Sequence, residues 1–120
     1  EWIDVSKAFI KQIVDTEHLF IIPVGTTSLR TLETLYWLGI KLKVDGVDNA
    51  KYLELKQWEN EKHSAVDISV RDSFQEILDY LESHNLDRFV ARTQIMITPD
   101  YKIKTAKAIV TNFHQPESNG

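Results

Sequence analysis

The chain has 120 residues, a formal net charge of −4 and no cysteine. A chain of this length usually forms one domain, and 42% hydrophobic residues are enough for a buried core. The absence of cysteine excludes disulfide stapling, thiolate catalysis and cysteine-ligated zinc. No apolar run approaches the roughly 20 residues of a membrane span, and residues 1–4 do not resemble a secretion signal. We therefore expect a cytoplasmic protein that does not associate with membranes.

The charges are unevenly distributed along the chain. Residues 86–110 contain five basic side chains against two acidic ones. The basic residues are Arg88, Arg92, Lys102, Lys104 and Lys107. The acidic average argues against general nucleic-acid coating, although this basic tract could face a polyanion. It could equally be a solvated strand edge protected by lysines.

In the first half of the chain, hydrophobic spacing predicts helix, strand and helix in turn. Residues 6–15 form an amphipathic helix with Ser6 as its N-cap. Residues 19–24 are continuously apolar, as in a strand covered on both faces. Residues 25–28 interrupt that strand, and a second helix runs from Leu29 until Gly39 ends it. The pattern is that of a β-loop-α unit.

The second half begins with a stretch, residues 41–70, in which only a turn at Asp45-Gly46 and an alternating strand at 52–58 can be read. Ser73 and Glu76 then form a capping box before a helix that ends near residues 84–85. The buried stripe of this helix consists of Phe74, Ile77, Leu78 and Leu81. Residues 94–98 and 102–111 follow as two strands joined by a short connection at 99–101.

Alternation of strands and helices indicates an α/β fold: a layered mixed sheet with flanking helices. We expect a single α/β domain over residues 1–120. Because a strand is followed at once by a polar, turn-rich end, we also expect a fragment of a larger α/β domain.

The first candidate site is the entry to the second predicted helix. Thr26, Thr27, Ser28 and Arg30 cluster where backbone N–H groups point out of a helix N-terminus and favour an anion. Such a site could hold a carboxylate or a phosphate. The alternative is ordinary N-capping, with Arg30 and Glu33 forming an exposed ion pair.

The second candidate site is Thr111-Asn112-Phe113-His114. Asn112 could read an amide or base edge, Phe113 could stack on a planar ring, and His114 could exchange a proton near neutral pH. The alternative is a polar turn.

Other chemistry has little support in the sequence. The remaining histidines lack metal-ligand spacing, so we expect no metal. No two carboxylates are spaced as a glycosidase pair. Trp2, Trp37 and Trp58 are typical of core or interface positions.

Both candidate segments resemble the S-adenosylmethionine:tRNA ribosyltransferase-isomerase family of queuosine biosynthesis. Residues 24–33, V-G-T-T-S-L-R-T-L-E, resemble its V-G-T-T-S-V-R-T-L-E signature. Residues 111–118, T-N-F-H-Q-P-E-S, resemble its T-N-F-H-L-P-K-S segment, and Pro99-Asp100-Tyr101 resembles the P-G-Y turn between them. The chain departs from the pattern at Asp100, Gln115 and Glu117. Members of this family are considerably longer, so the chain is similar to the C-terminal part of their larger domain.

The resemblance implies transfer and isomerisation of the ribosyl group of S-adenosylmethionine onto 7-aminomethyl-7-deazaguanine in tRNA. The product is epoxyqueuosine, with release of adenine and methionine. S-adenosylmethionine is thus the expected co-substrate, without a metal, and the modified tRNA is the expected partner. An isolated fragment is expected to be inactive.

Within that family reading, Thr26, Thr27, Ser28 and Arg30 would bind the methionine carboxylate or a tRNA phosphate. Glu33 would hold Arg30 in place. Thr111, Asn112 and Phe113 would border the substrate nucleobase or adenine, with His114 as the proton carrier. Two other functions compete with this interpretation: a non-catalytic α/β protein-interaction domain and a phosphate-ester-binding enzyme.

Overall fold

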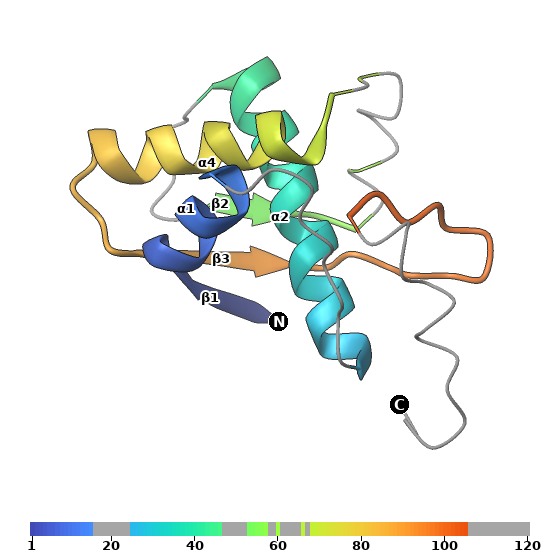
Figure 1. The fold of residues 1–120 in the computed structure, drawn as a ribbon. Helices are drawn as coiled ribbons and strands as arrows, with labels where there is room; N and C mark the ends of the chain where they lie inside the picture. Colours follow the sequence, from blue (N-terminus) through green and yellow to red (C-terminus); the bar gives the residue numbers. More distant parts are fainter. Residues whose placement is uncertain (16–24, 47–52, 58–59, 61–65, 67, 106–120) are drawn as a thin grey trace.

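The computed structural model describes residues 1–15, 25–46, 53–57, 60, 66 and 68–105. Its elements, in chain order, are β1 (Trp2–Ser6), α1 (Lys7–Asp15), α2 (Gly25–Asp45), β2 (Leu53–Leu55), α4 (Val70–Ser83) and β3 (Arg88–Thr93). Figure 1 shows helices α1 and α4 packed together above the strands, with α2 crossing beside them.

The strands form a mixed sheet in the order β1-β3-β2. Strand β1 runs antiparallel to β3, and β2 runs parallel to it, so Ile3 and Leu53 both lie opposite Ala91. Side chains alternate across the sheet: Ile3 and Ala91 are buried, whereas Trp2 and Val90 are exposed. The mixed α/β class predicted from the sequence is confirmed.

Helix α1 begins where the sequence predicts. The backbone N–H of Phe9 donates to Ser6 Oγ at 3.1 Å, which makes Ser6 the N-cap. Ile10, Ile13 and Val14 are buried on one side of the helix. The preceding strand β1 was not predicted, because its exposed-buried alternation covers only five residues.

Helix α2 does not end at Gly39, as the sequence predicts, but continues to Asp45. Gly39 lies against α4, and a Cβ atom there would overlap Ser73. This glycine therefore permits close helix packing instead of ending the helix. The predicted turn at Asp45-Gly46 is confirmed, since Gly46 has a φ of +73° and its N–H donates to Leu42 O at 3.0 Å.

Helix α4 carries the predicted apolar stripe of Phe74, Ile77, Leu78 and Leu81. Its last residue is Ser83 and its C-cap is His84, close to the predicted end near residues 84–85. The predicted capping box is wrong, however, because the N-cap is Ser69, whose side chain accepts from Asp72 N. Ser73 is buried within the helix and its hydroxyl donates to Tyr36 O at 2.5 Å.

The predicted strands are only partly reproduced. Within the described part of the strand predicted at 52–58, residues 53–55 form β2 and residues 56–57 do not continue it. The strand predicted at 19–24 lies outside the described residues. Residues 94–98 are not a strand, and neither is the described part, 102–105, of the strand predicted at 102–111. Residues 106–111 lie outside the described residues, and the strand of this region is β3. The ladder is interrupted because the N–H of Ile95 donates to the Thr93 hydroxyl at 3.1 Å. The connection at 99–101 is a turn, closed by Tyr101 N donating to Thr98 O at 3.0 Å.

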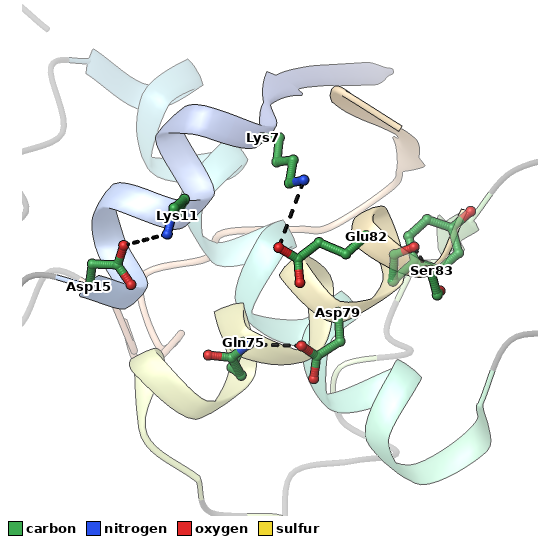
Figure 2. Close-up of polar contacts among 8 residues, drawn as sticks. Lys7, Lys11, Asp15, Gln75, Asp79, Glu82 and Ser83 are labelled. Carbon is green, nitrogen blue, oxygen red and sulfur yellow. Dashed lines mark hydrogen bonds and ion pairs between the residues drawn. The ribbon is translucent and has the colours of Figure 1, made fainter. Parts of the chain in front are cut away.

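Exposed polar contacts link the outer surfaces of α1 and α4 (Figure 2). Lys7 Nζ lies 3.8 Å from Glu82 Oε2, and within α1 Lys11 Nζ lies 2.9 Å from Asp15 Oδ2. The hydrogen bond to Asp15 raises the pKa of Lys11. Exposed pairs of this kind contribute little to stability. In the described part of the chain, no helix combines the length and apolar character needed to cross a membrane.

Candidate functional site

The most extensive buried polar cluster among the described residues is centred on Glu33 of α2. Its carboxylate is fully buried and accepts four hydrogen bonds from residues 101–105. Glu33 Oε1 accepts from the Tyr101 hydroxyl at 2.7 Å and from Lys104 N at 2.9 Å. Glu33 Oε2 accepts from Thr105 N at 2.7 Å and from the Thr105 hydroxyl. Two consecutive backbone N–H groups and two hydroxyls thus satisfy the buried carboxylate.

Tyr101 connects Glu33 to an aromatic pair on the same helix. The Trp37 indole N–H donates to the Tyr101 hydroxyl at 2.7 Å, and that hydroxyl donates onward to Glu33. Trp37 packs edge-on against Tyr36, with ring centroids 5.2 Å apart. Burial, reinforced by the Glu33 carboxylate, raises the pKa of Tyr101 well above its ordinary value. The hydroxyl therefore keeps its proton, and can donate to Glu33, to a higher pH than an ordinary tyrosine.

Helical geometry explains why Glu33 and Trp37 act together. The two residues are one helical turn apart, so both face the segment that contains the 98–101 turn. A second polar contact joins α2 to β3 close by, where the buried hydroxyls of Thr34 and Thr93 lie 3.0 Å apart. Residues 101–105 are consequently held against α2 by hydrogen bonds to its side chains in place of a strand ladder.

Arg30 is oriented away from Glu33. Its Nη2 atom lies 2.8 Å from Glu1 Oε1, and its Nε atom is buried without a hydrogen-bond partner within the described residues. The expected Arg30–Glu33 pair is wrong because the Glu33 oxygens are occupied by residues 101–105. Glu33 is also buried, not exposed as an ordinary surface pair would require.

The other predicted site residues divide into two groups. Thr26, Thr27 and Ser28 lie in the first turn of α2, which starts at Gly25 and not at Leu29. Thr111, Asn112, Phe113 and His114 lie outside the described residues.

The basic tract is partly neutralised where the structure describes it. Arg88 Nε lies 2.6 Å from Asp4 Oδ1, and Arg92 Nε lies 3.8 Å from Glu54 Oε2. These arginines lie on the exposed face of the sheet, whereas Lys102 follows the 98–101 turn and is exposed. The described residues contain no cluster of three metal-ligating side chains. Trp37 is buried, as predicted for a core position, whereas Trp2 is 54% exposed. Trp58 lies outside the described residues.

The roles of Tyr101 and Thr105 were not predicted. One sequence signal could have indicated the burial of Glu33: it follows Leu29 by four residues and precedes Trp37 by four, on an otherwise apolar helix face. A carboxylate on such a face needs donors from elsewhere in the chain. Which residues supply those donors depends on tertiary structure.

Structurally, the chain is a mixed α/β layer in which a buried carboxylate fixes a loop against its longest described helix. The family model described as "Queuosine biosynthesis protein" matches residues 1–120. The chain therefore belongs to the queuosine biosynthesis protein family.

Individual relatives give the same result. Over 121 residues the chain is 26% identical to the S-adenosylmethionine:tRNA ribosyltransferase-isomerase of Prochlorococcus marinus (strain MIT 9515), covering 99% of this chain and 21% of that protein. A stretch of 30 residues is 60% identical to the protein of the same name from Stenotrophomonas maltophilia (strain R551-3), covering 25% of this chain and 9% of the relative. The chain thus spans about a fifth of the length of the relative that it matches throughout. No solved structure matches it.

Proposed function

We propose that this chain is part of an S-adenosylmethionine-dependent tRNA ribosyltransferase-isomerase. The enzyme would transfer and isomerise the ribosyl group of S-adenosylmethionine onto 7-aminomethyl-7-deazaguanine in tRNA. It would form epoxyqueuosine and release adenine and methionine. Family membership over residues 1–120 and the relative aligned with 99% of the chain support this function.

The observation that carries the proposal is the contact between two segments that resemble the family. Glu33 is the last residue of the first segment, and Tyr101 is the last residue of the P-D-Y turn. Their side chains are hydrogen-bonded at 2.7 Å although 68 residues separate them in sequence. Segments recognised independently in the sequence therefore belong to one structural unit. This contact supports the proposal that residues 1–120 form one α/β domain within the catalytic domain of the enzyme. We also propose that this enzyme is cytoplasmic.

The start of α2 is the proposed anion site. The first backbone N–H groups of a helix and the helix dipole favour a negative charge, and Thr26, Thr27 and Ser28 belong to the first turn of α2. Arg30 lies one turn further on, with an Nε donor that makes no hydrogen bond within the described residues. We assign these four residues to the methionine carboxylate or to a tRNA phosphate.

The T-N-F-H segment is the proposed base-binding and proton-transfer element. Asn112 and Phe113 suit a planar heterocycle, through amide hydrogen bonding and ring stacking respectively. Thr111 would contribute a hydroxyl to the same base-binding site. The sulfonium acidifies protons on the adjacent ribose carbon, so the reaction needs a base near sulfur and a hydrogen-bond donor for departing adenine. His114 is assigned as a proton carrier.

The direct test uses S-adenosylmethionine labelled in the ribose and the longest natural protein that contains this segment. We expect label to enter tRNA carrying 7-aminomethyl-7-deazaguanine but not tRNA lacking that base. Label confined to free S-adenosylmethionine, with the protein folded, would overturn the proposed function.

The role of His114 is tested by replacing it with alanine in the same protein. His84→Ala is the matched control because His84 lies exposed at the end of α4. We expect His114→Ala to lower turnover by roughly 100-fold or more, as is usual for loss of general acid–base catalysis. Equal turnover of the two variants would remove His114 from the mechanism.

A further inference from the structure

The position of Glu33 suggests a function other than substrate binding. Within the family signature it lies three residues after Arg30, yet its carboxylate is fully buried and is surrounded by donors from residues 101–105. An ionised carboxylate can accept about four hydrogen bonds, and four donors from this segment already contact it. Glu33 therefore has little remaining capacity for a ligand.

The donors show what this carboxylate holds. Residues 102–105 have no strand partner, although the sequence pattern predicts a strand there. The backbone N–H groups of Lys104 and Thr105 are directed to Glu33 instead, with the Tyr101 and Thr105 hydroxyls beside them. One side chain of α2 thus replaces a strand ladder for this segment.

The held segment leads towards the second family motif. Thr105 is six residues before Thr111 and nine before His114 in the sequence, so the segment that Glu33 holds on α2 is the one that leads into this motif. The anion site proposed at the start of α2 lies about two helical turns or less from Glu33 on the same rigid helix.

We propose that Glu33 is a positioning residue. It holds Tyr101, Lys104 and Thr105, in the segment that leads into the T-N-F-H motif, on the helix that carries the proposed anion site. This inference rests on the proposed function. It assigns Glu33 a role exerted through residues 101–105, without contact with the substrate.

Three variants of the longest natural protein containing this segment test the proposal. Glu33→Gln replaces one acceptor oxygen by an NH₂ group, which is a donor. The backbone N–H groups of Lys104 and Thr105 can only donate, so the NH₂ group cannot accept their hydrogen bonds. Thr105→Val and Tyr101→Phe each remove one hydroxyl and leave the carboxylate bonded to both backbone N–H groups. Glu82→Gln is the matched control, since Glu82 is exposed on α4 and its contact with Lys7 is long, at 3.8 Å.

Steady-state kinetics are measured on protein whose folding has been verified by circular dichroism. For Glu33→Gln we expect kcat to fall roughly 10- to 100-fold, the range expected when reacting groups are displaced by about 1 Å. The KM values for S-adenosylmethionine and tRNA should change less than about threefold. Thr105→Val and Tyr101→Phe should give smaller losses of kcat, and Glu82→Gln none. The double variant Glu33→Gln/Thr105→Val should be no slower than Glu33→Gln, because both changes break the same contact.

Unchanged kcat in Glu33→Gln with a lower melting temperature would overturn the proposal, because Glu33 would then only stabilise the fold. If Glu33→Gln does not fold, unchanged kcat in both hydroxyl variants would overturn it equally. Failure of the proposed function gives a different result: wild-type protein transfers no ribosyl group. Amide exchange at residues 104 and 105 would still report whether Glu33 holds them, but the positioning role would be overturned with the function.

Discussion

Gly39 of α2 lies directly against Ser73 of α4. A Cβ atom at Gly39 would overlap both the hydroxyl and the carbonyl oxygen of Ser73. One turn earlier on α2, Tyr36 O accepts a hydrogen bond from the same serine hydroxyl at 2.5 Å. The close crossing of these two helices thus depends on the absence of a Cβ atom at Gly39 and on the buried hydrogen bond from Ser73 to Tyr36.

We expect Gly39→Ala to destabilise this chain by about 2 kcal/mol. Overpacking costs roughly 1–3 kcal/mol, and the overlap involves backbone atoms of α4 that cannot rotate away. Alanine's better helix propensity offsets only about 1 kcal/mol. The shift of the urea unfolding midpoint at constant m-value measures the effect.

Gly46→Ala provides the comparison, because nothing lies within 4 Å of the Gly46 Cβ position and only its φ of +73° opposes a side chain. It should cost about 1 kcal/mol, and Gly46→Asn less. A stability gain in Gly39→Ala would contradict the close helix packing described above.

Ser69→Ala should destabilise the chain by about 1 kcal/mol, because it removes the N-cap acceptor of α4. The Ser69 hydroxyl accepts from Asp72 N at 3.0 Å. Glu76→Gln tests the capping box predicted from sequence and should change the unfolding free energy by less than about 0.5 kcal/mol. A larger loss of stability in Glu76→Gln than in Ser69→Ala would contradict Ser69 as the N-cap and support the predicted capping box of Ser73 and Glu76.

Tyr101 should make stability decline at alkaline pH. Its pKa is raised from 10.0 in the folded chain, chiefly by burial and also by Glu33. Above pH 10 the unfolded chain loses this proton while the folded chain keeps it, so the unfolding free energy falls as pH rises. The contribution is up to about 1.4 kcal/mol per pH unit. Below pH 9 this group contributes no slope.

The measurement is urea unfolding between pH 9 and pH 11 for wild type and Tyr101→Phe. We expect the variant to decline less steeply above pH 10, since it has no proton to lose at this position. If the unfolding free energies of wild type and Tyr101→Phe declined in parallel with pH, the pKa of Tyr101 would be the same in the folded and unfolded chain, which would contradict this prediction.

Arg30→Gln should weaken substrate binding in the longest natural protein containing this segment. Loss of a charge-assisted hydrogen bond costs roughly 1.5–3 kcal/mol, which corresponds to about a 10- to 100-fold increase in KM for the ligand concerned. Arg71→Gln is the matched control, because Arg71 is exposed on α4. KM values for S-adenosylmethionine and for tRNA, measured separately, identify which anion Arg30 contacts. Equal KM values in both variants would contradict the anion site.

The sequence predicts the helices better than the strands, for a physical reason. The apolar stripes at Ile10, Ile13 and Val14, and at Phe74 and Leu81, are local patterns that a helix must bury. Strands depend on partners elsewhere in the chain. Thus residues 94–98 have a strand-like composition and bury Ile95 without forming a strand.

In the candidate site, too, local sequence patterns are predictable, whereas contacts between distant segments are not. The motif at 24–33 overlaps the N-terminal part of α2, and the hydrogen-bond partners of Glu33 come from residues 101–105. Sequence spacing favours an Arg30–Glu33 pair because the residues lie three apart on a helix. Burial overrides that local preference, since a carboxylate that is fully buried takes the donors that reach it.

Adenine release from S-adenosylmethionine tests the central claim most directly. The longest natural protein containing this segment is assayed with tRNA carrying 7-aminomethyl-7-deazaguanine, with tRNA lacking it, and beside the 120-residue chain. We expect adenine only from the longer protein and only with the modified tRNA. Absence of adenine from every mixture, with both proteins folded, would contradict a ribosyltransferase-isomerase and leave the two motifs without that chemistry.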